Sequence, residues 1–104
     1  MAVYTLSEEL INSKPEIRIG DKIYKVDDRK KTVDKISKIS KKSPEDADGE
    51  MIKLALGEKA AKEIEEMDLP FPAYTQLLTL IGAAVSGEKP EEIEARFQEA
   101  KAAN

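Results

Sequence analysis

Residues 16–40, EIRIGDKIYKVDDRKKTVDKISKIS, decide the fold of this chain. Two short runs rich in β-branched and aromatic residues, 17–19 and 23–26, flank a turn that contains Gly20. This pattern predicts a β-hairpin. Two strands alone are marginally stable in water, so one face of the hairpin must pack against helices. Ile17 and Ile19 are expected on that face, with Tyr24 or Val26 as further candidates.

The second half of the same stretch predicts a basic amphipathic helix over residues 29–42. Val33, Ile36 and Ile39 recur at every third position and form an apolar stripe, while the lysines lie mostly off it. Asp27 and Asp28 suit the start of this helix. A carboxylate there accepts backbone N–H groups and complements the helix dipole.

The remaining chain reads as helical, and several boundaries are predicted by glycine and proline. Residues 42–49 are expected to interrupt the helices, with Ser43 capping a new helix that has Pro44 at its first position. A weak capping box is expected between Ser43 and Asp46. Gly57 either kinks or ends the helix that follows. Residues 73–86 form the most apolar element, which we expect to be the core helix, ended by Gly87. Pro90 opens a last helix.

We therefore expect a single α+β domain over residues 1–104, with a short N-terminal β-hairpin packed on a bundle of about four α-helices. The hairpin is expected over residues 15–27 and the helical part over 28–104. Residues 1–14 are expected to form a flexible arm. Within it, residues 3–6 fit an extended segment and Ser7 fits the cap of one helical turn.

Composition excludes several kinds of chemistry. The 104 residues include no cysteine and no histidine. Thiol nucleophiles, Cys/His zinc sites and imidazole bases are therefore absent from this sequence. We predict that the chain is not an enzyme and has no catalytic, cofactor-binding or metal site. No secretory signal pattern and no membrane-spanning run are recognisable, so a cytoplasmic protein is expected.

Charge is distributed unevenly along the chain. Residues 22–42 carry nine basic and three acidic side chains, a net charge of +6, whereas residues 43–104 carry a net charge of −8. This separation favours either the steering of a partner or head-to-tail self-association.

Two groups of residues are candidates for binding. The electrostatic candidates lie on the basic helix and are Lys30, Lys31, Lys35 and Lys38. The alternative for them is a solvated helix face, because no aromatic residue is interleaved with the lysines. The apolar candidates are expected to contact a partner and are Phe71, Tyr74, Leu77, Leu78, Ile81, Ile93 and Phe97.

Two acidic groups invite a chemical interpretation that their spacing does not favour. Asp46, Asp48 and Glu50 superficially resemble a calcium loop, but the EF-hand spacing around Gly49 fails. An acid-rich helix N-terminus explains them better. The carboxylates of residues 63–68 have no histidine or metal-ligand spacing beside them, so a solvated helix end is the preferred interpretation.

The hairpin and the lysines after it resemble a known family. The pattern I-x-I-x-x-K-x-Y-x-V-x-D followed by a Lys-rich helix is similar to the N-terminal part of tail assembly chaperones from long-tailed bacteriophages (siphophages) and prophages of Gram-positive hosts. The matching residues are Ile17, Ile19, Lys22, Tyr24, Val26 and Asp28, followed by Arg29, Lys30 and Lys31. About a quarter of the chain carries this resemblance well.

The resemblance implies a non-enzymatic chaperone without a cofactor. Such proteins act in the bacterial host cytoplasm, coat the helical tape measure protein, recruit tail-tube subunits and are absent from the mature virion. Many have a longer form made by translational frameshift, and this chain would be the short form. Self-association is expected, whereas a membrane partner and a nucleic-acid partner are not. The alternatives are a small nucleic-acid-binding or regulatory protein using the basic helix 29–42, and a structural head–tail component of the virion.

Overall fold

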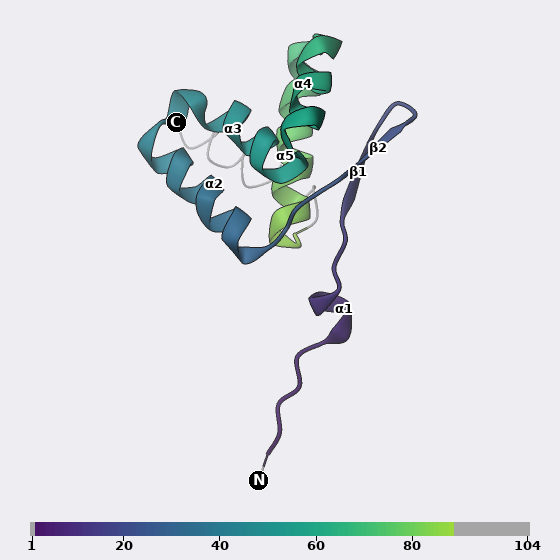
Figure 1. The fold of residues 1–104 in the computed structure, drawn as a ribbon, viewed down its shortest axis with the longest axis vertical. Helices are drawn as coiled ribbons and strands as arrows, with labels where there is room; N and C mark the ends of the chain where they lie inside the picture. The colour runs from purple at the N-terminus through teal and green to yellow at the C-terminus, as the bar shows by residue number, and fades with distance from the viewer. Residues whose placement is uncertain (1, 89–104) are drawn as a thin grey trace, which may run out of the picture.

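The computed structural model describes residues 2–88 and confirms the α+β fold. A hairpin is followed by helices, as Figure 1 shows. The elements are α1 (Glu8–Ile11), β1 (Glu16–Ile19), β2 (Lys22–Lys25), α2 (Lys30–Lys42), α3 (Pro44–Leu56), α4 (Glu58–Met67) and α5 (Phe71–Ser86). The helix expected from Pro90 lies outside the described residues.

The hairpin turn consists of Gly20 and Asp21 and is one residue shorter than the expected connection, because Lys22 already pairs with Ile19 as the first residue of β2. β1 and β2 pair antiparallel, with Ile17 opposite Tyr24 and Ile19 opposite Lys22. Gly20 has a φ of 63°, whereas Asp21 is not among the residues with positive φ. Positive φ at the first central residue alone is the pattern of a type II′ turn, which matches the twist of the strands. Ile17 and Tyr24 are both buried, so the predicted inner face is confirmed.

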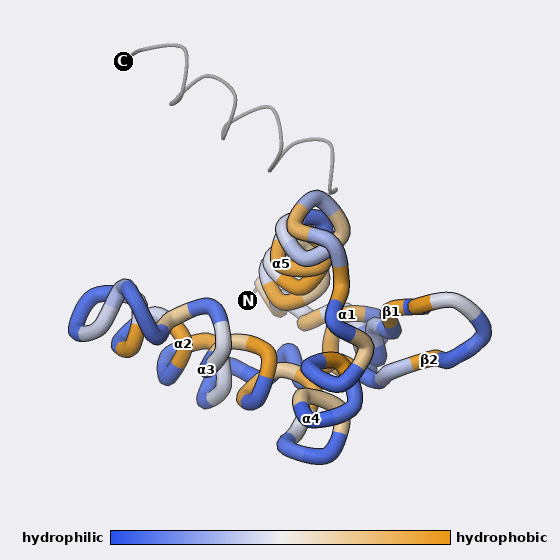
Figure 2. Tube along the Cα trace, turned by 90° about the horizontal axis from the view of Figure 1, so that it is seen from above, coloured by the Kyte–Doolittle hydropathy of each residue, from blue (hydrophilic) through white to orange (hydrophobic). Residues whose placement is uncertain are grey.

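The core forms where the hairpin meets the helices. Its buried residues come from β1, from the segment after β2, and from α3, α4 and α5; they are Ile17, Val26, Ile52, Ala55, Ile64, Leu77 and Ile81. Ile81 of α5 is fully buried, which confirms α5 as the core helix. Figure 2 shows α5 as mostly hydrophobic, whereas α2 and the hairpin turn are mostly hydrophilic. A backbone bond from Asp27 N–H to the Ala55 carbonyl (2.7 Å) fixes the hairpin to the end of α3.

The expected interruption over residues 42–49 is wrong, because α3 begins at Pro44 and runs through Gly49. Ser43 alone separates α2 from α3. The fixed φ of proline suits a first helical position, and the first-turn acids Glu45 and Asp46 favour the dipole. The expected capping box does not form, because the Ser43 side chain makes no capping hydrogen bond. This corner places the basic α2 directly beside the acidic start of α3.

Residues with positive φ end α3, α4 and α5. Gly57 (φ 95°) ends α3 rather than kinking it, and Gly87 (φ 77°) ends α5 as predicted. Asp68 (φ 49°) ends α4. α5 begins at Phe71, two residues earlier than expected, since Pro72 fits the first turn of a helix.

The N-terminal segment extends away from the helices (Figure 1). It contains the expected one-turn helix α1, but the Ser7 side chain before it makes no capping hydrogen bond. Residues 2–6 are extended (Figure 1) and exposed. The radius of gyration is 15.3 Å, with extents of 55 × 37 × 28 Å. A compact chain of about 100 residues has a radius near 13 Å. The arm and hairpin account for this elongation.

Candidate functional site

The N-terminal arm, residues 2–14, presents apolar side chains that its own chain does not cover. Its large apolar residues are between 59% and 95% exposed; they are Val3, Tyr4, Leu6, Leu10 and Ile11. A fold that buries none of these side chains gains no stability from their hydrophobicity. The arm is therefore available to another surface.

The predicted apolar binding group is divided by the fold. Phe71, at the start of α5, is 76% exposed, and Tyr74 and Leu78 are half-buried. Leu77 (3% exposed) and Ile81 (0%) face the core instead, so they cannot contact a partner in this structure. The group is divided because α5 is apolar on most sides. The side that carries Leu77 and Ile81 packs into the core, whereas Phe71 at the start of the helix does not. Ile93 and Phe97 lie outside the described residues.

The basic helix separates its lysines into two groups. Lys31, Lys35, Lys38 and Lys42 follow steps of four, three and four residues and therefore share one face of α2; we call them the lysine row. All four are exposed, and none forms an ion pair within the described part of the chain. Lys30 does not belong to the row. Its ammonium binds Asp34 one turn along the helix at 2.8 Å.

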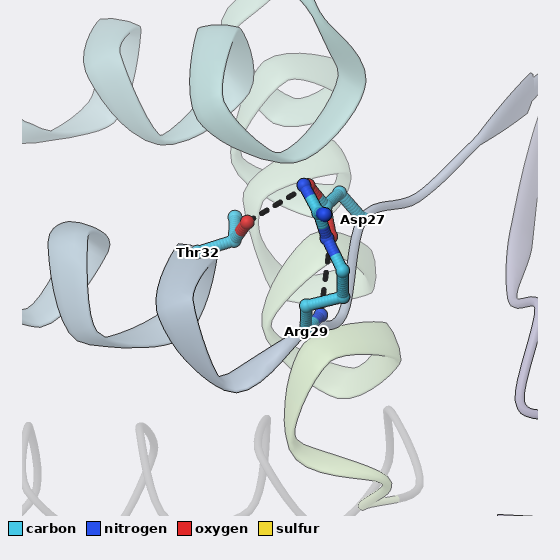
Figure 3. A network of polar contacts seen from close by, with 3 residues as sticks. All are labelled: Asp27, Arg29 and Thr32. Carbon is cyan, nitrogen blue, oxygen red and sulfur yellow. Dashed lines mark hydrogen bonds and ion pairs between the residues drawn. The ribbon is translucent and has the colours of Figure 1, made fainter. Parts of the chain in front are cut away.

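One carboxylate orders the start of α2, as Figure 3 shows. Asp27 Oδ1 accepts hydrogen bonds from the Arg29 backbone N–H (3.1 Å) and from Arg29 Nε (2.9 Å). Asp27 Oδ2 accepts from Arg29 Nη2 (2.9 Å) and from the Thr32 hydroxyl (2.8 Å). The Arg29 guanidinium is the main cause that holds the pKa of Asp27 well below its ordinary value. These bonds join Asp27 to the N-cap residue Arg29 and to Thr32 in the first turn, but among the described residues no side-chain hydrogen bond caps the backbone N–H groups of α2.

A groove with a volume of about 810 Å³ lies between the end of α2, α3, α4 and the start of α5. Its floor is apolar and includes Ile52, Ile64 and Tyr74. Its walls carry six carboxylates, from Glu45, Asp46, Asp48, Glu50, Glu65 and Asp68. Among the residues that the structure describes, Lys53 is the one cation that lines it, and its Nζ lies 3.7 Å from Glu50 Oε1. We call this feature the acidic groove.

The acidic groove influences its aromatic residue. Burial, and secondarily the charge of Asp48, raises the pKa of Tyr74. The six carboxylates make the surface of the groove negative. Such a surface attracts cationic groups and repels anionic ones.

Sequence reasoning did not identify the acidic groove. The acids of residues 45–50 were interpreted as the N-terminus of a helix, and those of 65–68 as a separate helix end. The sequence does show many acidic residues both before and after residue 57. Whether they come together depends on the angle between α3 and α4. The turn at Gly57 decides that, and a one-residue link gives no sequence rule for the angle.

The described residues include no candidate metal-binding cluster and no candidate membrane-spanning helix. Within residues 2–88, no group of three or more acidic side chains is placed to hold a metal ion. None of the helices in this range is long and apolar enough to cross a bilayer. The arrangement can bind through charge and apolar contact.

Comparisons with protein-family models, with curated proteins and with solved structures found no match.

Proposed function

We propose that this chain is a non-enzymatic tail assembly chaperone, which binds a tape measure protein and recruits tail-tube subunits in a bacterial host cell. The observation that carries the proposal is the exposed apolar surface of the arm and of Phe71, which is 76% exposed. Exposed apolar residues that form patches mark sites where another chain binds. The resemblance of the hairpin and the lysines after it supplies the identity of the partner.

The partner is a long amphipathic helix whose apolar side needs cover until tail-tube subunits replace the chaperone. Val3, Tyr4 and Leu6 provide an extended apolar strip, and Phe71 provides an aromatic anchor on a rigid helix. Aromatic anchors frequently dominate the binding energy of an interface. A flexible apolar strip combined with one rigid aromatic anchor suits a protein that binds many similar turns of one helix in succession.

Co-purification with the tape measure protein of the same genome tests the proposal. Phe71→Ser and a chain lacking residues 2–13 are expected to retain the fold and to bind at least about tenfold more weakly. Gln76→Ala, an exposed change on the same helix, is the matched control and should leave binding unchanged. Absence of binding by the unaltered chain, in either its short or an extended form, contradicts the proposal.

The lysine row favours one second candidate, a small nucleic-acid-binding protein. Four exposed lysines on one helix face can contact phosphates, and such binding weakens steeply with salt. Binding of duplex DNA or RNA that disappears in Lys31→Gln/Lys35→Gln/Lys38→Gln would favour this candidate. Equal binding by that variant would exclude it.

A further inference from the structure

The chain carries two unsatisfied surfaces of opposite charge. The lysine row contributes four ammonium groups, none of which is in an ion pair among the described residues. Lys38 lies near Asp34, but that carboxylate already binds Lys30 at 2.8 Å. The acidic groove contributes six carboxylates against one lysine. Glu50 lies 3.7 Å from Lys53, and the other five carboxylates form no ion pair among the described residues.

The two surfaces do not neutralise each other within one molecule. α2 and α3 pack side by side and are joined through Ser43, yet no ion pair in the described part of the chain joins these helices. Ile39, which lies on the apolar stripe of α2, lines the groove, whereas the lysine row does not line it. The lysines therefore lie beside the groove and outside it.

We propose that this chain self-associates, with the lysine row of one copy against the acidic groove of a second copy. Each copy carries both halves of the contact, so a head-to-tail arrangement can continue from copy to copy. Charge decides among the segments of this chain that could occupy the groove. Residues 22–42 carry a net charge of +6, whereas residues 2–14 and residues 89–104 each carry more acidic than basic side chains.

The association is weak and depends on salt. Ion pairs between exposed side chains contribute little individually, and a set of them mainly steers and orients the encounter. The half-buried Leu69 and Tyr74 on the groove floor add apolar contact. At an ionic strength of about 0.01 M the charges act over roughly 30 Å, whereas at about 1 M the range falls to roughly 3 Å. High salt should therefore separate the copies.

Sedimentation velocity of the whole chain tests this proposal. The unaltered chain should exceed the mass of one copy at low salt and approach it at high salt. Lys31→Glu/Lys35→Glu/Lys38→Glu and Glu45→Lys/Asp48→Lys/Glu65→Lys should each sediment as single copies at low salt. An equimolar mixture of these two variants should associate again, because each supplies a surface that fits the other.

Matched controls separate this contact from a general charge effect. Lys59→Glu/Lys62→Glu and Glu58→Lys/Glu66→Lys alter exposed residues of α4 that line neither surface, and they should leave the mass unchanged. Circular dichroism verifies the fold of every variant. Where a reversal on α3 impairs folding, Glu45→Gln/Asp46→Asn/Asp48→Asn replaces it and should weaken association about tenfold.

Three outcomes overturn the proposal. The first is an unaltered chain that stays monomeric at low salt up to about 1 mM. The second is a failure of the two reversed variants to associate when mixed. The third is a lysine-row variant that loses nucleic-acid binding while its mass is unchanged, which assigns the row to nucleic acid. The pull-down with the tape measure protein is independent of these results.

Discussion

The hydroxyl of Tyr24 on β2 donates a hydrogen bond to Glu63 Oε2 on α4, with 3.0 Å between the oxygens. Lys22 lies 3.8 Å from the same carboxylate oxygen. The partners are 39 residues apart in sequence, so this bond fixes the hairpin against a helix formed much later in the chain. Burial, followed by the bond and charge of Glu63, raises the pKa of Tyr24.

Tyr24→Phe should lower the free energy of unfolding by about 1 kcal/mol, since it removes one hydrogen bond while the ring stays packed. Urea unfolding measures the change. Glu63→Ala should cost a similar amount, and the double variant should cost less than the two single changes added together. Additive costs would show that the two side chains do not interact.

Asp27 makes stability sensitive to acid. Its pKa in the folded chain lies below the ordinary value of 3.8, chiefly through Arg29. The carboxylate therefore contributes stability that is fully present above pH 3.8 and is lost as the pH falls toward the folded value. Asp27→Asn should cost about 1–2 kcal/mol at neutral pH and clearly less near about pH 3.

The control for this effect is the neighbouring Asp28→Asn, which should cost less stability because Arg29 and Thr32 bind Asp27. Urea unfolding across this pH range measures both variants. A cost of Asp27→Asn that stays constant down to about pH 3 would show that its charge does not stabilise the start of α2.

Replacing Gly57 and Gly49 by alanine should change the stability of the chain in opposite directions. Gly57 has φ 95° and ψ 159°, a region that other residues rarely adopt. Gly57→Ala should therefore destabilise the chain by about 1–3 kcal/mol. Gly49 lies inside α3, with nothing within 4 Å of an added Cβ, so Gly49→Ala should stabilise it by about 0.5–1 kcal/mol. Thermal unfolding compares the pair, and equal shifts would contradict the helix boundaries.

Ile81 and Phe71 lie on the same helix, but their replacement by alanine should affect stability very differently. Ile81 has no exposed surface, so Ile81→Ala leaves a cavity and should cost about 2–5 kcal/mol. Phe71 is 76% exposed, so Phe71→Ala should change stability by no more than about 0.5 kcal/mol. Chemical denaturation distinguishes them. A large cost at Phe71 would mean that its ring packs within its own chain.

The hairpin and the helix identities were predictable because their determinants are local. The pairing of Ile17 with Tyr24 follows from alternation around a two-residue turn. Gly87 ends α5 because glycine adopts a left-handed conformation without a steric cost. The break after Lys42 and the helix start at Pro44 are confirmed, but the expected length of the break, through Gly49, was wrong for a physical reason. A proline and two acids favour a helix start so strongly that α3 begins after one linking residue.

The candidate surfaces were predictable only in part. The lysines of α2 are visible as a periodic pattern, but the sequence does not show that Asp34 removes Lys30 from the group. The separation of Phe71 from Leu77 depends on which side of an almost wholly apolar helix meets β1, α3 and α4. The acidic groove also depends on long-range packing, because its lining residues come from four different helices.

The central claim is that this chain acts by covering apolar surface on another protein. The most direct measurement is the soluble fraction of the tape measure protein expressed with and without this chain, using Phe71→Ser as the matched variant. The account predicts that the unaltered chain keeps the tape measure protein in solution and that Phe71→Ser does so less well. A tape measure protein that is equally insoluble with and without the unaltered chain would contradict the claim.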